Sequence, residues 1–124
     1  MFALEPGEPL GRYHWEADQE DFLVLRGEAL LLVEGEERPL RRWDVVHCPP
    51  GTRHVILGAG DGPCLVLGVG ARDHRGDPAR IGYPVDPAAL RHGAGVDREA
   101  ASAEEAYAGL PPRQPARCRD DWLP

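Results

Sequence analysis

Apolar residues gather in short runs between residues 20 and 70, and turn-forming or charged residues separate these runs. The runs are FLVLR (22–26), ALLLV (29–33), RPL (38–40), VVHC (45–48), HVILG (54–58) and CLVLGVG (64–70). Short apolar segments at about ten-residue spacing, divided by glycine and proline, are typical of β-sandwiches and β-barrels. Between the second and third runs, EGEE predicts a four-residue hairpin loop.

Several of these segments are apolar at consecutive positions, which indicates that both faces of a sheet are covered. A second subunit could supply one of the covers. In VVHC, alternation along a strand places Cys48 toward the interior and His47 toward the outside. A buried cysteine of this kind normally packs as a small hydrophobic residue. By the same alternation, Tyr13 is expected to face away from the side to which His14 points.

The pattern changes after Gly70, where the chain becomes polar and rich in turns. DPAALRHG offers Asp86 as a helix N-cap, and SAEEAYAGL offers Ser102 and Glu105 as a capping box. A proline-rich tail, PPRQPARCRDDWLP, follows. We therefore divide the chain into a barrel over residues 1–70 and an appendage over residues 71–124. The appendage is predicted to hold two short helices and the tail, packed on the barrel or on a partner subunit.

Length and charge limit the classes of molecule that the protein is expected to bind. A chain of 124 residues is enough for one modest core. The net charge of −7 and the lack of a basic stripe argue against nucleic-acid binding. No run of 18 apolar residues suggests a membrane span. The first residues, MFALEPGEPLG, do not resemble a signal peptide, so we expect a cytoplasmic protein. The partner that we expect is a small-molecule ligand or substrate.

The inventory of reactive side chains is short. All 14 basic residues are arginine, which excludes Schiff-base chemistry and a P-loop lysine. The single serine, Ser102, lies at a predicted helix cap, so a Ser-His-Asp triad is not expected. The three cysteines form no CxxC motif, which argues against a cysteine zinc site. Carboxylates and imidazoles remain, and they favour a metal site or acid–base chemistry.

Four such side chains have the spacing of a possible site. His14 and Glu16 are two residues apart, so on a strand they share a face. Glu20 leads into an apolar strand, and His54 begins another one. If these strands are neighbours, the four groups converge, and two imidazoles with two carboxylates suit Zn, Mn, Fe, Ni or Co. Three protein ligands with open positions would make the site catalytic in type. His74 and His92 lie in the appendage and are expected to be solvated.

Two motifs resemble the signatures of the cupin superfamily, small β-barrels of two packed sheets. HWEADQEDFLVLRG supplies His14, Glu16, Glu20 and Gly27, and PPGTRHVILG supplies Pro49, Gly51 and His54. Glu16 stands where the family usually has a second histidine, and Gly58 replaces the usual asparagine. The resemblance covers roughly residues 11 to 70. It implies an all-β fold, a cupin-type double-stranded β-helix (jelly roll), with the appendage added after it.

The resemblance also implies one divalent transition metal ion, Mn, Fe, Zn or Ni, with His14, Glu16, Glu20 and His54 as its ligands. Glu16 could instead stay unligated and act as a catalytic base. One functional hypothesis is a metal-dependent isomerase, dioxygenase or decarboxylase acting on a small oxygenated metabolite. The other is a non-catalytic module that binds or senses a small ligand, with a structural metal or none. A homodimer is expected, because pairing would cover an apolar sheet face.

Overall fold

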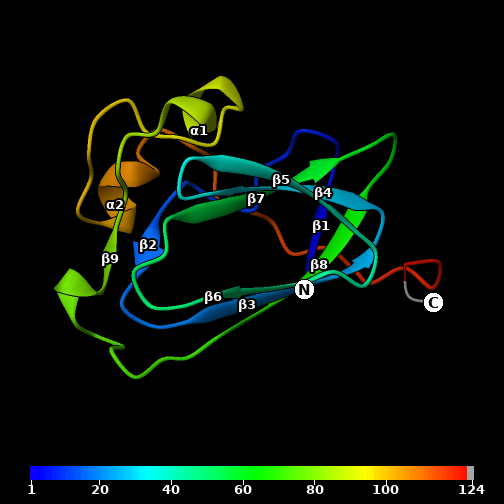
Figure 1. Ribbon diagram of the computed structural model, residues 1–124, viewed down its shortest axis with the longest axis horizontal. Helices are drawn as coiled ribbons and strands as arrows, with labels where there is room; N and C mark the ends of the chain where they lie inside the picture. The colour runs from blue at the N-terminus through cyan, green and yellow to red at the C-terminus, as the bar shows by residue number, and fades with distance from the viewer. Residues whose placement is uncertain (123–124) are drawn as a thin grey trace.

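Two antiparallel β-sheets face each other in the computed structural model of the protein, which describes residues 1–122 (Figure 1). The four-stranded sheet has the order β1 (Phe2–Leu4), β8 (Cys64–Gly70), β3 (Glu20–Arg26) and β6 (Val45–Cys48). The three-stranded sheet has the order β5 (Glu36–Arg41), β4 (Glu28–Val33) and β7 (His54–Ala59). This is the predicted all-β jelly-roll fold. Over the described residues, ladder hydrogen bonds do not close the two sheets into one continuous barrel.

The core between the sheets is filled by alternate residues of each strand. Phe22 of β3, Ile56 of β7 and Val66 of β8 are 6% exposed or less in one apolar cluster. Side chains alternate along a strand, so their neighbours point to the outer faces. Cys48 belongs to this cluster while His47 is exposed, which confirms the predicted orientation of both.

The outer face of the three-stranded sheet is covered by the C-terminal half of the chain. A second apolar cluster forms there from Tyr13, Leu32, Val55, Leu57, Ala89 and Ala94. Ala89 belongs to α1 (Pro87–Arg91), which lies above this sheet in Figure 1. The consecutive apolar residues of β4 and β7 are therefore explained by a cover from the same chain. Tyr13 is buried on the side away from His14, as expected.

The two predicted helices are present and short. Asp86 Oδ1 accepts a hydrogen bond from the third residue of α1 at 2.8 Å, which confirms it as the N-cap. Ser102 Oγ accepts from the backbone N–H of Glu105 at 3.3 Å at the start of α2 (Ala103–Ala106). The Glu105 carboxylate accepts from the N–H of Ala101 rather than from the cap residue itself. Among residues 1–122, no helix is long and apolar enough to cross a membrane.

The EGEE hairpin differs from its prediction. The loop has two residues rather than four, because Val33 already pairs with Glu36 across β4 and β5. The two turn residues, Glu34 and Gly35, have φ angles of 47° and 81°. Positive φ at both central positions is the geometry of a tight turn whose twist matches the flanking strands. The acidic residues at 36 and 37 therefore belong to a strand.

A short ribbon that the sequence pattern did not predict links the two halves of the chain. β2 (Trp15–Glu16) pairs with β9 (Ile81–Gly82), which follows the 3-10 turn η1 (Pro78–Arg80). Gly82 is needed at this crossing, because a Cβ atom there would lie 2.6 Å from the indole of Trp15. The ribbon places the start of the appendage beside the segment that carries His14.

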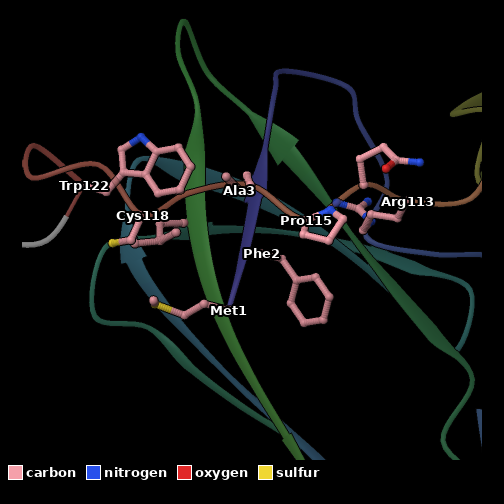
Figure 2. A pocket seen from close by; sticks show the side chains of 10 residues that line it. Met1, Phe2, Ala3, Arg113, Pro115, Cys118 and Trp122 are labelled. Atoms are coloured by element: carbon pink, nitrogen blue, oxygen red, sulfur yellow. The ribbon is translucent and has the colours of Figure 1, made fainter.

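The proline-rich tail runs back along the outside of β1 and β8. Arg113 donates to the carbonyl of Pro9 at 2.8 Å and lies 3.5 Å from the carboxylate of Glu8. A cavity of about 370 Å³ lies between the tail and the sheet, and Figure 2 shows Ala3, Cys118 and Trp122 around it. The tail thus packs on the barrel without approaching the candidate metal ligands.

Candidate metal centre

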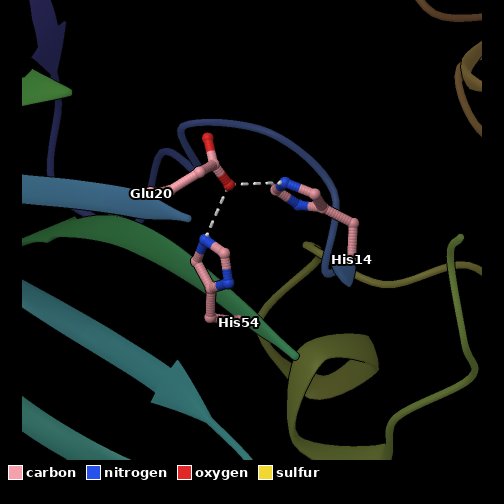
Figure 3. Close-up of side chains that lie close together, drawn as sticks. All are labelled: His14, Glu20 and His54. Carbon is pink, nitrogen blue, oxygen red and sulfur yellow. Dashed lines mark hydrogen bonds and ion pairs between the residues drawn. The ribbon is translucent and has the colours of Figure 1, made fainter. Parts of the chain in front are cut away.

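The two motif histidines are brought together by backbone pairing. His14 and His54 face each other in an isolated antiparallel bridge, in which each N–H donates to the carbonyl of the other at 3.1 and 2.9 Å. Glu20 is the first residue of β3 and points between the two rings (Figure 3). Its inward direction follows from the alternation that buries Phe22 on the same strand.

Hydrogen bonds to backbone carbonyls fix the state of both imidazoles. His14 Nδ1 lies 2.7 Å from the carbonyl of Arg12, and His54 Nδ1 lies 2.9 Å from the carbonyl of Thr52. A carbonyl can only accept, so each Nδ1 carries a hydrogen. In the neutral ring, each Nε2 atom then keeps an unshared electron pair that can bind a metal ion. They lie 3.2 Å (His14) and 3.1 Å (His54) from the same oxygen of Glu20, Oε2.

His14 Nε2, His54 Nε2 and Glu20 Oε2 point toward one another, and three groups that carry electron pairs can only be held this close by a cation between them. In the absence of a metal, a proton takes this role. Burial alone would lower the pKa of His54, but its contacts with Cys48 and Glu20 raise that pKa to about 10. Burial would likewise raise the pKa of Glu20, but its contacts with His14 and His54 lower that pKa to about 2. The pair is therefore held as imidazolium and carboxylate.

The same donors fit a divalent transition metal. His14, Glu20 and His54 each offer one atom, and these three atoms lie within 4.8 Å of one another. His54 Nε2 is fully buried and, among the described residues, makes no hydrogen bond of good geometry. An orphaned nitrogen of this kind, beside a carboxylate and a second imidazole, is what a metal ligand requires. Two histidines and one carboxylate form a donor set that leaves coordination positions open.

Glu16 lies at the rim of this group. Its Oε1 is 3.7 Å from His14 Nε2, and its side chain is about one-fifth exposed. Burial, and then the nearby charge of Glu20, raise the pKa of Glu16. Its backbone carbonyl accepts from the N–H of Gly51, which ties the PPGT turn to β2. The structure therefore brings three of the four predicted ligands together and places the fourth, Glu16, next to them.

Two aromatic residues that the sequence motifs did not point to form the walls of the site. Phe22 lies 5.5 Å from the ring of His54, and Tyr83 lies 5.9 Å from the ring of His14, measured between centroids. Tyr83 is 4% exposed, and burial, then Tyr107 and Glu16, raise its pKa. Tyr83 follows β9, so only the unforeseen β2–β9 pairing brings it to the site.

The remaining histidines pair with carboxylates elsewhere. His47 Nδ1 lies 2.6 Å from Asp21 on the outer face of the four-stranded sheet. The side chain of His74 is 52% exposed, as predicted for a solvated residue, and that of His92 is one-third exposed. Each also contacts a carboxylate, His74 at 2.6 Å from Asp18 and His92 at 3.0 Å from Glu37. The hydrogen bond with His74 lowers the pKa of Asp18 and raises that of His74. These contacts hold surface segments and do not join the metal centre.

Comparison with known proteins agrees with this geometry. Residues 1–70 match the Cupin_2 family model, a cupin domain. That span is more than half of the chain, so the chain belongs to the cupin family. No curated protein matches the sequence significantly.

Several solved structures share the fold. A cupin-superfamily sugar phosphate isomerase from Silicibacter pomeroyi is 30% identical with a TM-score of 0.52, over 56% of this chain and 46% of that one. A predicted oxalate decarboxylase from Thermotoga maritima is 28% identical with a TM-score of 0.51, over 55% and 59% of the two chains. A cupin-like protein from the same organism has a TM-score of 0.58 at 24% identity, over 77% and 71%, which shows the fold alone. The chain covers less than half of the first of these structures.

Proposed function

We propose that this cupin is a metal-dependent enzyme that acts on a small oxygenated metabolite, with an isomerase, dioxygenase or decarboxylase type of reaction. One observation carries the proposal. Two imidazole Nε2 atoms, each freed by a backbone contact at Nδ1, converge with a carboxylate oxygen in a nearly buried cluster. The neighbours named sugar phosphate isomerase and oxalate decarboxylase support the same class of substrate.

His14, Glu20 and His54 would hold the ion, and Mn, Fe, Zn or Ni each fit two nitrogen donors and one carboxylate. When bound, the ion supplies a Lewis acid that polarises an oxygen of the substrate. Carbonyl acceptors at both Nδ1 atoms hold the imidazole rings in one orientation, which keeps the site preorganised.

Glu16 is the residue we assign to proton transfer. Its carboxyl group lies beside the ligand set, and its raised pKa brings it closer to neutral pH, where a general base works best. Phe22 and Tyr83 flank the two imidazoles and restrict the entry of water. A substrate that bears two neighbouring oxygens would reach the open positions with its acidic proton toward Glu16.

The first experiment measures metal content by elemental mass spectrometry on protein purified without a histidine tag. We expect about one equivalent of a divalent transition metal in the wild type and almost none in His54→Ala. His47→Ala, a substitution of the same kind on the outer face, should keep its metal. A wild-type protein that carries none and binds none on titration would overturn the proposal. Stoichiometric metal without turnover of any hydroxy- or keto-acid or sugar phosphate would instead favour a ligand-binding module.

We also infer that two copies of the chain pair through the outer face of the four-stranded sheet. Val45 and Val69 on this face are 71% and 58% exposed, and Leu23 lies in register between their strands. Exposed apolar residues of this kind favour association. Light scattering after size exclusion should give the mass of a dimer, and Val45→Glu should shift it to a monomer. A wild-type monomer at micromolar concentration would contradict the pairing.

A further inference from the structure

We propose that Tyr107, in the C-terminal segment beyond the family match, is a positioning residue for the candidate metal ligand His14. The two residues do not touch. They are joined through Arg12, whose backbone N–H donates to the hydroxyl of Tyr107 at 2.8 Å and whose carbonyl accepts from His14 Nδ1 at 2.7 Å. Arg12 thus binds the residue at the end of α2 through its N–H and the imidazole of His14 through its carbonyl.

The orientation of the Arg12 carbonyl decides which nitrogen of His14 faces Glu20. That carbonyl holds the hydrogen on Nδ1, so Nε2 is left as the donor toward the metal. The Arg12 carbonyl belongs to the peptide group that Arg12 shares with Tyr13, whereas the N–H that donates to Tyr107 belongs to the peptide group that Arg12 shares with Gly11. The two groups are linked through the φ and ψ angles of Arg12, so a contact that holds the N–H restricts the positions that the carbonyl can take. If these angles change, His14 loses its acceptor and can take the other tautomer.

The sequence makes room for this contact at Gly11. A Cβ atom at Gly11 would lie 2.8 Å from the hydroxyl oxygen of Tyr107, closer than a real contact allows. The backbone of Gly11 is not in the left-handed region, so the need for glycine here is one of space. The absent side chain is what allows the hydroxyl to reach Arg12.

The rest of the segment has its own anchors, which makes the hydroxyl separable from the fold. The Arg12 guanidinium donates to the carbonyl of Gly95 at 2.7 Å, and the N–H of Tyr13 donates to Ala94 at 2.8 Å. The ring of Tyr107 also packs edge-on against Tyr83, with 6.0 Å between centroids. Tyr107→Phe keeps these contacts and removes only the acceptor of the Arg12 N–H.

The proposal rests on the metal site proposed above, so its test uses one readout with metal and one without. The first is the affinity for Zn(II), measured by competition with a chromophoric chelator. The second is the imidazole tautomer of His14 in the metal-free protein, read from long-range ¹H–¹⁵N correlations. We compare the wild type with Tyr107→Phe, Gly11→Ala and the double variant. Tyr13→Phe is the matched control, because its hydroxyl lies beside Gly35 and away from the site.

We expect Tyr107→Phe and Gly11→Ala each to weaken Zn(II) binding about fivefold, which corresponds to one hydrogen bond. In both, His14 should show a mixture of tautomers, while Tyr13→Phe behaves as the wild type. The double variant should bind no more weakly than Tyr107→Phe alone, because the added methyl group then has no hydroxyl to displace. Wild-type affinity and a single His14 tautomer in Tyr107→Phe would overturn the proposal. A wild type that binds no Zn(II) would refute the metal site, and the tautomer would still decide the role of Tyr107.

Discussion

Two imidazole–carboxylate contacts lie on opposite faces of the same strand, β3. On the inner face, Glu20 meets His54 at 3.1 Å and His14 at 3.2 Å. On the outer face, the next residue, Asp21, meets His47 at 2.6 Å. The outer contact is shorter, yet only the inner one has the features of a metal centre.

Burial and the second imidazole make the difference. The side chain of His54 is 3% exposed and that of His47 is 57% exposed. Water can replace either partner of the outer pair, and exposed pairs of this kind contribute little to stability. The inner donors are buried (His54) or largely shielded from water (His14 and Glu20, 15% and 19% exposed), and both Nδ1 atoms are already bound, so the remaining electron pairs face one another. Distance alone therefore does not identify the functional pair.

The sharpest way to break the comparison is to remove one imidazole from each face. His54→Ala should weaken metal binding at least about 100-fold, the upper end of what loss of an outer-shell partner costs. It should also lower the free energy of unfolding of the metal-free protein by about 2–4 kcal/mol, because the partly buried Glu20 loses a partner and the buried imidazole leaves a cavity. Chelator competition and urea unfolding measure both quantities. His47→Ala should leave metal affinity unchanged, and equal losses in the two variants would refute the distinction.

A second test concerns Glu16, the additional carboxylate beside the inner contacts. If Glu16 moves a proton, Glu16→Gln should lower kcat about 100-fold or more, the usual contribution of a general base. Metal affinity should change by less than about tenfold, since the amide still fills the rim of the site. Once a substrate is found, steady-state kinetics and metal titration on the same preparation separate the roles. Loss of the metal with retained kcat per bound metal would make Glu16 a ligand.

The stability of the metal-free protein should depend on pH through the inner pair, His54 and Glu20. The folded-state pKa of His54 is about 10, above its unfolded value of 6.5, so its stabilisation is complete below pH 6.5 and is lost as the pH rises to about 10. The folded-state pKa of Glu20 is about 2, below its unfolded value of 4.5, so its stabilisation is lost as the pH falls from about 4.5 to 2. Urea unfolding should therefore show a constant free energy of unfolding between about pH 4.5 and 6.5, with lower values on either side. In His54→Ala the decline at high pH should disappear and the decline at low pH should become smaller, because Glu20 keeps only His14 as a partner, whereas His47→Ala should keep both declines.

The smallest effect belongs to the outer pair itself. In the Val45→Glu background, in which the outer face is open to water, Asp21→Asn should change the free energy of unfolding by no more than about 1 kcal/mol, and the change should shrink as salt screens the charges. Urea unfolding at low and at high ionic strength gives both numbers. A larger, salt-independent loss in this monomeric background would contradict the assignment of the outer pair as a solvent-exposed contact.

Much of the barrel could be predicted because its strands are marked locally. Glycine and proline interrupt the apolar runs at turns, so six strands from β3 to β8 lie where the runs do. β1 and β9 were missed because two or three residues carry no periodicity. β2 was treated as a strand only through the spacing of His14 and Glu16, and its partner was not foreseen. Such strands exist through pairing with distant partners, as Phe2 pairs with Val66.

The candidate site was predictable in its ligands and less so in its surroundings. His14, Glu20 and His54 follow from motif spacing, because the strands that carry them are neighbours in the fold. The walls and supports come from contacts that no spacing encodes. Tyr83 reaches the site through the β2–β9 ribbon, and Tyr107 reaches Arg12 across 95 residues of sequence.

That separation has a consequence for how the protein is made. A ribosome delivers His14 long before Tyr107, and at usual elongation rates 95 residues take about 5 to 20 s. In the later part of this interval, after His54 has been made, the nascent barrel has all three donors but lacks the contact that holds the Arg12 N–H. With the role proposed for Tyr107, the candidate centre is complete only after Tyr107 has left the exit tunnel. Metal would then enter the site after the barrel strands have been synthesised.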